Sequence, residues 1–388
     1  MIKRILSALL AVCLVLSLSG CGSIFNGRRY VVSDYIDESS ADDDIDDIKS
    51  YNSLYRAVNG MVVRHDEEGH FKFLNYSGDI SDDLAQACRE VKSETALGAY
   101  SIDYISYDVS RIVSYYEASV YITYKRSKDQ ADSIVSIGSS INIKKYLQDC
   151  MTTMNPSLTL SMNTTMVDEA SVREYISDIY YSNPLCCVIC PDVTVNIYPD
   201  TGVQKIFEIY FNYSGIEKGE LSEMKADLLS TAANYANEVD DKSPQSSVVS
   251  IISLMRDRCI CSDLTPLDED YDPLSSTAYG AVVGGFADSE GFAVGVASLC
   301  VASGVKCTVV SGRLNNEEHY WNIVEFGGSS YHIDAFELAR DPSLPIRFLS
   351  DTDISGSYWW DTSKYPACTS SLYAAPVSAA ETEGIIEN

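Results

Sequence analysis

Between residues 51 and 238, short runs in which apolar and polar positions alternate are interleaved with longer runs whose apolar positions recur at helical spacing. A period of two predicts half-buried strands, and a period near 3.6 predicts amphipathic helices. The predicted strands lie at residues 61–64, 70–76, 101–107, 119–125, 193–198 and 204–213, with hairpin turns at 66–69 and 199–202. The predicted helices lie at residues 80–94, 142–154, 168–180 and 220–237. This mixture predicts an α+β fold class.

Two parts of this region share a sequence. Phe73-Leu-Asn-Tyr-Ser-Gly78 precedes Leu84, and Tyr210-Phe-Asn-Tyr-Ser-Gly215 precedes Leu221, so the leucine follows the glycine at the same spacing. A divergent repeat of ββα units explains both matches, and Tyr121-Ile-Thr-Tyr-Lys125 is interpreted as the same strand position in a third copy. The tyrosines of these strands either form a platform for carbohydrate or peptide, or pack on helices with their hydroxyls at the rim, which is the commoner arrangement.

The C-terminal part contains an apolar helix and a hairpin. From residue 289 to 302 the apolar positions recur at helical spacing, and Gly304 is suited to a left-handed cap. Two β-like runs, 319–326 and 329–335, are separated by two glycines, which is a hairpin signal. If this turn closes the hairpin, Asp334 lies opposite Trp321 and diagonal to His319 on the same face. These elements predict a helix packed on an antiparallel sheet.

Three side chains with the chemistry of a nucleophile, a base and an acid occur in these elements, in that order. Ser289 falls in the first turn of the helix, where free backbone N–H groups and the helix dipole favour a developing negative charge. His319 begins the hairpin and Asp334 ends it, so the carboxylate can orient the imidazole. The predicted site therefore consists of Ser289, His319 and Asp334. No catalytic role is assigned to His65, His70 or His332.

The text around these residues resembles the transglutaminase-like superfamily of papain-type cysteine enzymes, in its bacterial secreted branch. The matching segments are residues 278–285 leading into Ser289-Glu-Gly-Phe-Ala293, then His319-Tyr-Trp-Asn322, then Tyr331-His-Ile-Asp334. The resemblance covers about residues 245–340. It implies a cysteine thiolate that attacks a glutamine or peptide carbonyl, a histidine base, and an aspartate that holds the imidazole tautomer, at the positions of Ser289, His319 and Asp334.

The chain departs from this family pattern at two positions. Ser289 stands where the family has its nucleophilic cysteine, and Tyr320 stands where the family usually has a small residue. A cysteine with a reference pKa of about 8.5 becomes thiolate beside a helix N-terminus and an imidazolium, whereas a serine hydroxyl must lose its proton during attack. Cys300 lies eleven residues further along the helix, about 16 Å away, and cannot substitute. Ser289 thus favours a catalytically silent domain.

The first 20 residues have the pattern of a bacterial lipoprotein signal peptide. Lys3 and Arg4 form a basic start, and residues 5–18 an apolar core shorter than the roughly 20 residues that span a bilayer. Leu18-Ser-Gly-Cys21 resembles a lipobox. We therefore expect a mature chain that begins at Cys21, carries lipid on that cysteine, and is anchored to the extracytoplasmic face of the cell membrane.

The chain is strongly acidic, with 56 acidic residues against 28 basic ones and a net charge of −28. Such a surface repels nucleic acid and anionic lipid, so we expect no nucleic-acid partner and assign membrane attachment to the lipid on Cys21. Ten cysteines remain beside Cys13 and Cys21, and their spacing does not determine disulfide pairing. Cys186-Cys187-Val-Ile-Cys190 is either a metal cluster or a set of partly buried thiols, and the absence of an accompanying histidine favours thiols. No metal site and no cofactor are predicted.

These observations divide the chain into five parts and leave three function hypotheses. The parts are a signal peptide at 1–20, a lipidated acidic tether at 21–52, an α+β domain of ββα-type repeats at 53–240, a transglutaminase-like domain at 244–375 and a tail at 376–388. The first hypothesis is a catalytically silent transglutaminase-like domain that binds a peptide, cell-wall or protein partner. The alternatives are a serine-dependent acyl hydrolase, transferase or protease on the same frame, and a scaffold acting through the N-terminal repeats.

Overall fold

The computed structural model describes residues 47–138, 142–240, 242–265 and 267–373. These residues form two compact units, one within Met1–Ile143, Leu158–Glu169 and Val195–Ile209, the other within Lys144–Ser157, Ala170–Thr194 and Tyr210–Asn388. Both mix helices and strands, which confirms the predicted α+β class. The predicted signal peptide, Cys21 and nearly all of the acidic tether lie outside the described residues. In the part that is described, no helix is long and apolar enough to cross a membrane.

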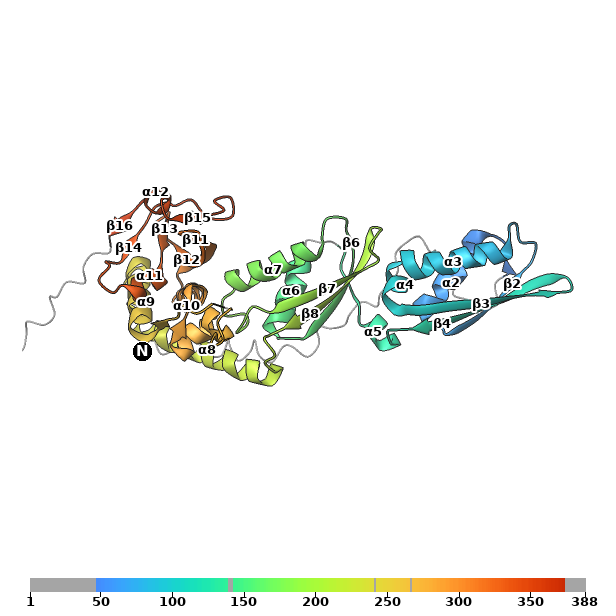
Figure 1. Cartoon of the computed structure of the whole chain (residues 1–388), viewed down its shortest axis with the longest axis horizontal. Helices are drawn as coiled ribbons and strands as arrows, with labels where there is room; N and C mark the ends of the chain where they lie inside the picture. Colours follow the sequence, from blue (N-terminus) through green and yellow to red (C-terminus); the bar gives the residue numbers. More distant parts are fainter. Residues whose placement is uncertain (1–46, 139–141, 241, 266, 374–388) are drawn as a thin grey trace, which may run out of the picture. The chain divides into compact units, whose positions relative to one another are not determined.

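A four-stranded sheet with helices on one face lies in the first unit. Its elements are β1 (Asp47–Ile48), α2 (Tyr51–Arg64), β2 (Glu68–Phe73), α3 (Ile80–Glu94), α4 (Ala96–Ser101), β3 (Ile102–Ile112) and β4 (Tyr115–Tyr124). The strand order is β1-β2-β4-β3, with β1 parallel to β2 and the other neighbours antiparallel. Helices α2 and α3 contact each other beside this sheet (Figure 1), and their residues Leu54, Val58 and Leu84 share one core with Val120 and Ile122.

Helix α2 occupies the place where the sequence predicted the first strand of a hairpin. Its buried residues Leu54, Val58 and Met61 are three or four positions apart, which is helical spacing. The Ser50 side chain caps the helix N-terminus, and His65 ends the helix with a φ of 65°. The hairpin predicted over residues 61–76 is therefore wrong, because its first apolar run is the last turn of an amphipathic helix.

A second four-stranded sheet repeats the connectivity of the first. Its elements are α5 (Lys128–Asp132), β5 (Val135–Ser136), α6 (Ile143–Thr152), β6 (Ser157–Asn163), α7 (Glu169–Ser182), β7 (Asp192–Tyr198) and β8 (Gln204–Asn212). The strand order is β5-β6-β8-β7, with β5 parallel to β6. Each sheet therefore arises from a strand, a helix, a strand, helical structure and a closing hairpin. The second predicted ββα unit is present as β7, β8 and the helix Lys218–Glu238, whereas the first is not, because α2 takes the place of its first strand.

The shared text does not mark equivalent positions in the two sheets. Phe73 ends β2, whereas Tyr210 lies in β8, and these strands occupy different places in the common order. Tyr121, from the weaker third match, lies in β4, which is the counterpart of β8. The repeat is thus present in the topology, but the longer text match aligned it wrongly.

The remaining elements belong to the second unit. They are α8 (Lys218–Glu238), α9 (Pro244–Arg258), β9 (Ile260–Cys261), the 3-10 helix η2 (Pro273–Ser276), the π-helix η3 (Gly280–Gly284), β10 (Phe286–Ala287), α10 (Ser289–Ala302), β11 (Lys306–Leu314), β12 (Glu317–Phe326), β13 (Ser329–Ile333), α11 (Ala335–Arg340), β14 (Arg347–Phe348), α12 (Asp351–Ile354), β15 (Tyr358–Trp360) and β16 (Leu372–Tyr373). Helix α10 is buried along most of its length and contacts β11 and β12 of the sheet β13-β12-β11-β15. The predicted helix at 289–302 is confirmed, as is its packing on an antiparallel sheet.

The β12–β13 hairpin has the predicted turn but a shorter second strand. Gly327 and Gly328 have φ values of 60° and 80°, the left-handed region that a two-residue turn of this kind requires. Strand β13 ends at Ile333 instead of residue 335, because the Asp334 carboxylate caps α11 by accepting a hydrogen bond from the amide of Glu337. The predicted domain boundary at 240–244 lies inside the second unit, and the domain limits stay a prediction.

Candidate functional site

His319 and Asp334 form a buried hydrogen-bonded pair. Nε2 of His319 lies 2.7 Å from Oδ2 of Asp334, and their side chains are 7% and 10% exposed. The hydroxyl of Tyr358 donates a second hydrogen bond to Oδ2 over 2.8 Å, and the amide of Glu337 donates to Oδ1 over 3.0 Å. The carboxylate is therefore fixed by three donors, which is what a residue that orients an imidazole requires.

Aromatic rings enclose this pair. The imidazole of His319 stacks on Trp321 with the ring centroids 6.2 Å apart, and it meets Phe336 and Tyr358 edge to face at 5.9 and 6.0 Å. These rings exclude water and so strengthen the bond to Asp334. Nδ1 of His319 makes no hydrogen bond to a described residue, and this atom is not completely buried. The free nitrogen of the imidazole thus faces an accessible side of the ring.

Ser289 begins α10, as the sequence predicts, but it is not joined to the histidine. The preceding residue, Asp288, caps the helix through the amide of Gly291 at 2.9 Å and accepts a 2.5 Å hydrogen bond from Ser276. Ser289 itself is half-buried, and its hydroxyl makes no hydrogen bond to any residue in the described part of the chain. The structure thus joins two of the three predicted site residues by a hydrogen bond and shows none for the Ser289 hydroxyl among the described residues.

The carboxyl group next to Ser289 was not foreseen. Oε1 of Glu290 accepts a 2.8 Å hydrogen bond from the hydroxyl of Tyr181, a residue of α7. The Tyr181 ring lies 5.9 Å from the ring of Tyr320, which is the second position where the chain departs from the family pattern. Burial raises the pKa of the Glu290 carboxyl to about 8.

His332 has a structural environment, separate from the pair above. Its Nδ1 accepts a hydrogen bond from Nε1 of Trp321 at 3.0 Å, and its Nε2 lies 2.8 Å from Oδ1 of Asp351. These partners assign the neutral tautomer with the proton on Nε2. Burial lowers the pKa of His332, which favours the same neutral form. Trp321 therefore connects the two histidine–aspartate pairs, stacking on one imidazole and donating to the other.

Two groups of side chains include residue types that bind metals. His332, Asp351 and Cys368 have ligand atoms within 4.8 Å of one another. Both imidazole nitrogens of His332 are already engaged in hydrogen bonds, however, so no lone pair is free for a cation. The ten cysteines in the described ranges are all free thiols, and Cys186 contacts Cys187 with 3.5 Å between the sulfurs. Whether the Cys186–Cys190 segment is a metal cluster or a set of partly buried thiols stays a prediction.

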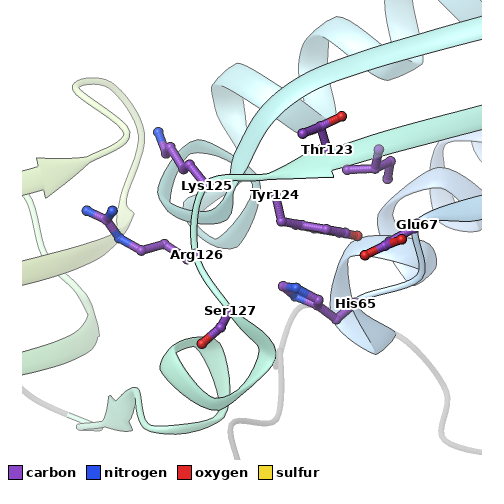
Figure 2. Close-up of a pocket in the computed structure, with 8 residues that line it drawn as sticks. His65, Glu67, Thr123, Tyr124, Lys125, Arg126 and Ser127 are labelled. Atoms are coloured by element: carbon purple, nitrogen blue, oxygen red, sulfur yellow. The ribbon is translucent and has the colours of Figure 1, made fainter.

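A cavity of 440 Å³ lies in the first unit, apart from the predicted site residues. It is lined by His65, Glu67 and residues 122–127. Figure 2 shows the His65 imidazole and the Tyr124 ring facing each other, with Arg126 turned away from them; the two rings stack at 3.8 Å. Nδ1 of His65 is buried without a partner among the described residues. Neither Ser289 nor His319 nor Asp334 lines this cavity.

Comparisons with known proteins give only distant likenesses. One solved structure is described as "Crystal structure of a TGase", with a TM-score of 0.26, 11% identity, and coverage of 56% of this chain and 60% of the other. Another is described as "The Crystal Structure of a Putative Cysteine Protease from Cytophaga hutchinsonii", with a TM-score of 0.24, 12% identity, and coverage of 38% and 62%. The chain thus spans about three fifths of the length of either structure. Both TM-scores lie below 0.5, so neither likeness establishes a shared fold. No family model and no curated protein matches the chain.

Proposed function

We propose that this chain is a lipid-anchored, extracytoplasmic protein whose C-terminal part is a catalytically silent transglutaminase-like domain. The domain retains an imidazole–carboxylate pair and uses its surface to bind a peptide, cell-wall or protein partner. The order of Ser289, His319 and Asp334 in motifs that resemble the family supports this proposal.

One observation carries the proposal of silence. The Nε2–Oδ2 distance of 2.7 Å in the His319–Asp334 pair is that of a working base and its orienting acid, whereas the Ser289 hydroxyl has no hydrogen bond within the described residues. A serine hydroxyl is not ionised near neutral pH and becomes nucleophilic only when a base takes its proton during attack, whereas a cysteine thiol at the same position would be partly thiolate already. The adjacent Glu290 carboxyl, whose pKa burial raises to about 8, is mostly protonated near neutral pH and adds little negative charge at the start of α10.

The test replaces Ser289 by cysteine and measures alkylation of the new thiol by iodoacetamide. At the first turn of α10 the thiol should react fast near neutral pH, and His319→Ala should slow it, because a nearby imidazolium stabilises the thiolate. Ser81→Cys is the matched control, since Ser81 is exposed in the first turn of α3. A thiol at position 81 lies at a helix N-terminus but has no histidine–aspartate pair beside it. The unsubstituted chain gives the background from the other thiols.

Labelling of the unsubstituted chain distinguishes a catalytically silent domain from one that uses Ser289 as a nucleophile. A silent domain should not be labelled by a fluorophosphonate probe. Labelling that disappears in both Ser289→Ala and His319→Ala would instead establish a serine-dependent acyl hydrolase or transferase, which the accessible Nδ1 of His319 favours. If Ser289→Cys reacts no faster than Ser81→Cys, the retained frame itself is refuted.

A further inference from the structure

Strand β3 ends the first sheet, and its outer edge is long. In the strand order β1-β2-β4-β3, β3 pairs with β4 on one side, and no described strand lies on the other. It spans eleven residues, Ile102–Ile112, so a row of backbone N–H and C=O groups is open to pairing. At the opposite edge, β1 has only two residues. The exposed edge of β3 is therefore the main site at which this sheet can be extended.

The side chains in the middle of β3 leave an apolar row at this edge. Ile105, Tyr107 and Val109 lie opposite Ile122, Val120 and Ala118 of β4, so they belong to the face covered by the helices. Ile105 and Val109 are only partly buried at the border of that core, and Tyr107 is 36% exposed. Lysine and proline, which commonly block edge strands, are absent from Ile102–Ile112, and the register is irregular only next to Asp103. The apolar row thus reaches the edge, and the charges of β3 lie at Asp103, Asp108 and Arg111.

We propose that β3 pairs antiparallel with β3 of a second copy of this chain, with Tyr107 on the twofold axis. This register places Ile105 opposite Val109 of the second copy, so each half-buried side chain covers another. It also brings Asp103 and Arg111 together just beyond both ends of the regular ladder, where the long Arg111 side chain can reach the carboxylate. Neither Asp103 nor Arg111 has an ion-pair partner among the described residues.

The opposite charges of Asp103 and Arg111 favour a second copy in this register. A shift that moves the axis to Asp108 would place two carboxylates opposite each other, which is unfavourable. The axis at Tyr107 instead pairs opposite charges twice, because the twofold repeats each contact. An interface of one strand per copy is small, so we expect a reversible dimer with a dissociation constant in the micromolar range.

A cysteine on the axis tests the register. In Tyr107→Cys the two new thiols would face each other within the Cα separation of about 4.4–6.8 Å that a disulfide spans, so mild oxidation of the purified full chain should yield a covalent dimer. Tyr104→Cys is the matched control, because Tyr104 is an exposed tyrosine of the same strand. Its copy lies about 20 Å away in this register. Covalent dimer from Tyr104→Cys at the same level, or none above the parent chain from Tyr107→Cys, would overturn the proposal.

Reversing the charge of Arg111 tests the proposed dimer without introducing a cysteine. Arg111→Glu should weaken dimerisation about tenfold in sedimentation velocity, since two exposed ion pairs are lost and replaced by repulsion. The double variant Asp103→Arg with Arg111→Asp restores opposite charges and should recover the parent constant. A parent chain that stays monomeric at high micromolar concentration, or a double variant as weak as the single one, would refute pairing through this edge.

Discussion

Replacing Glu290 by glutamine should make the second compact unit more stable at alkaline pH. Glutamine keeps the size of the side chain and an oxygen that can accept the hydrogen bond from Tyr181, but it carries no charge at any pH. In the parent chain, burial raises the pKa of Glu290 from 4.5 to about 8. The unfolded chain therefore loses this proton at lower pH than the folded chain does.

The sign and size of the effect follow from this difference. Between pH 4.5 and pH 8 the folded state binds more protons than the unfolded state, so the free energy of unfolding falls as pH rises. Below pH 4.5 no penalty exists, and above pH 8 it is constant. A shift from 4.5 to about 8 corresponds to at most about 5 kcal/mol. Glu290 keeps part of its surface accessible, so we expect about 2–3 kcal/mol.

Urea unfolding followed by tryptophan fluorescence measures this effect in the correct unit. All three tryptophans, Trp321, Trp359 and Trp360, lie in the second unit. The difference in stability between Glu290→Gln and the parent should grow in favour of the variant from pH 5 to pH 9, while other titrating groups cancel. A difference that stays constant across this range would show that Glu290 is not desolvated in the folded state, and the electrostatic reasoning would fail.

Three further changes have defined outcomes. Cys21→Ala should abolish metabolic labelling with a lipid probe and release the protein from the membrane fraction; persistent labelling would contradict the anchor. Trp321→Phe leaves Nδ1 of His332 without a donor and should cost about 1–3 kcal/mol in urea unfolding followed by circular dichroism. Glu208→Gln removes the 2.9 Å ion pair with the partly buried Arg126 and should cost about 3 kcal/mol in the same assay, with little dependence on salt.

The C-terminal helix and hairpin were predictable because their signals are local. The two glycines specify the turn, and the apolar run from Ser289 to Ala302 specifies the helix, so each element is determined within its own residues. The prediction of a first strand at residues 61–64 was wrong because the local signal there is ambiguous. The three apolar residues at 61–63 fit a strand as well as a helix, and only their spacing from Leu54 and Val58 distinguishes the two.

The hydrogen-bonding partners of the site were not predictable in the same way. The order of serine, histidine and aspartate indicated the His319–Asp334 pair, whose two residues share a hairpin. Tyr358 reaches Asp334 from 24 residues away, and Tyr181 reaches Glu290 from 109 residues away. No periodicity relates such residues, because their proximity depends on how separate elements pack.

The short loop between His319 and Asp334 bears on how such a site changes during evolution. The two residues are 15 positions apart, on either side of a two-glycine turn, so they meet with little loss of chain entropy and early in folding. Ser289 lies at the start of helix α10, outside the hairpin, and its side chain takes no part in closing the hairpin. A substitution at that position therefore leaves the folding of the histidine–aspartate pair unchanged. Selection for a stable hairpin alone would preserve the pair through many generations after a nucleophile had been lost.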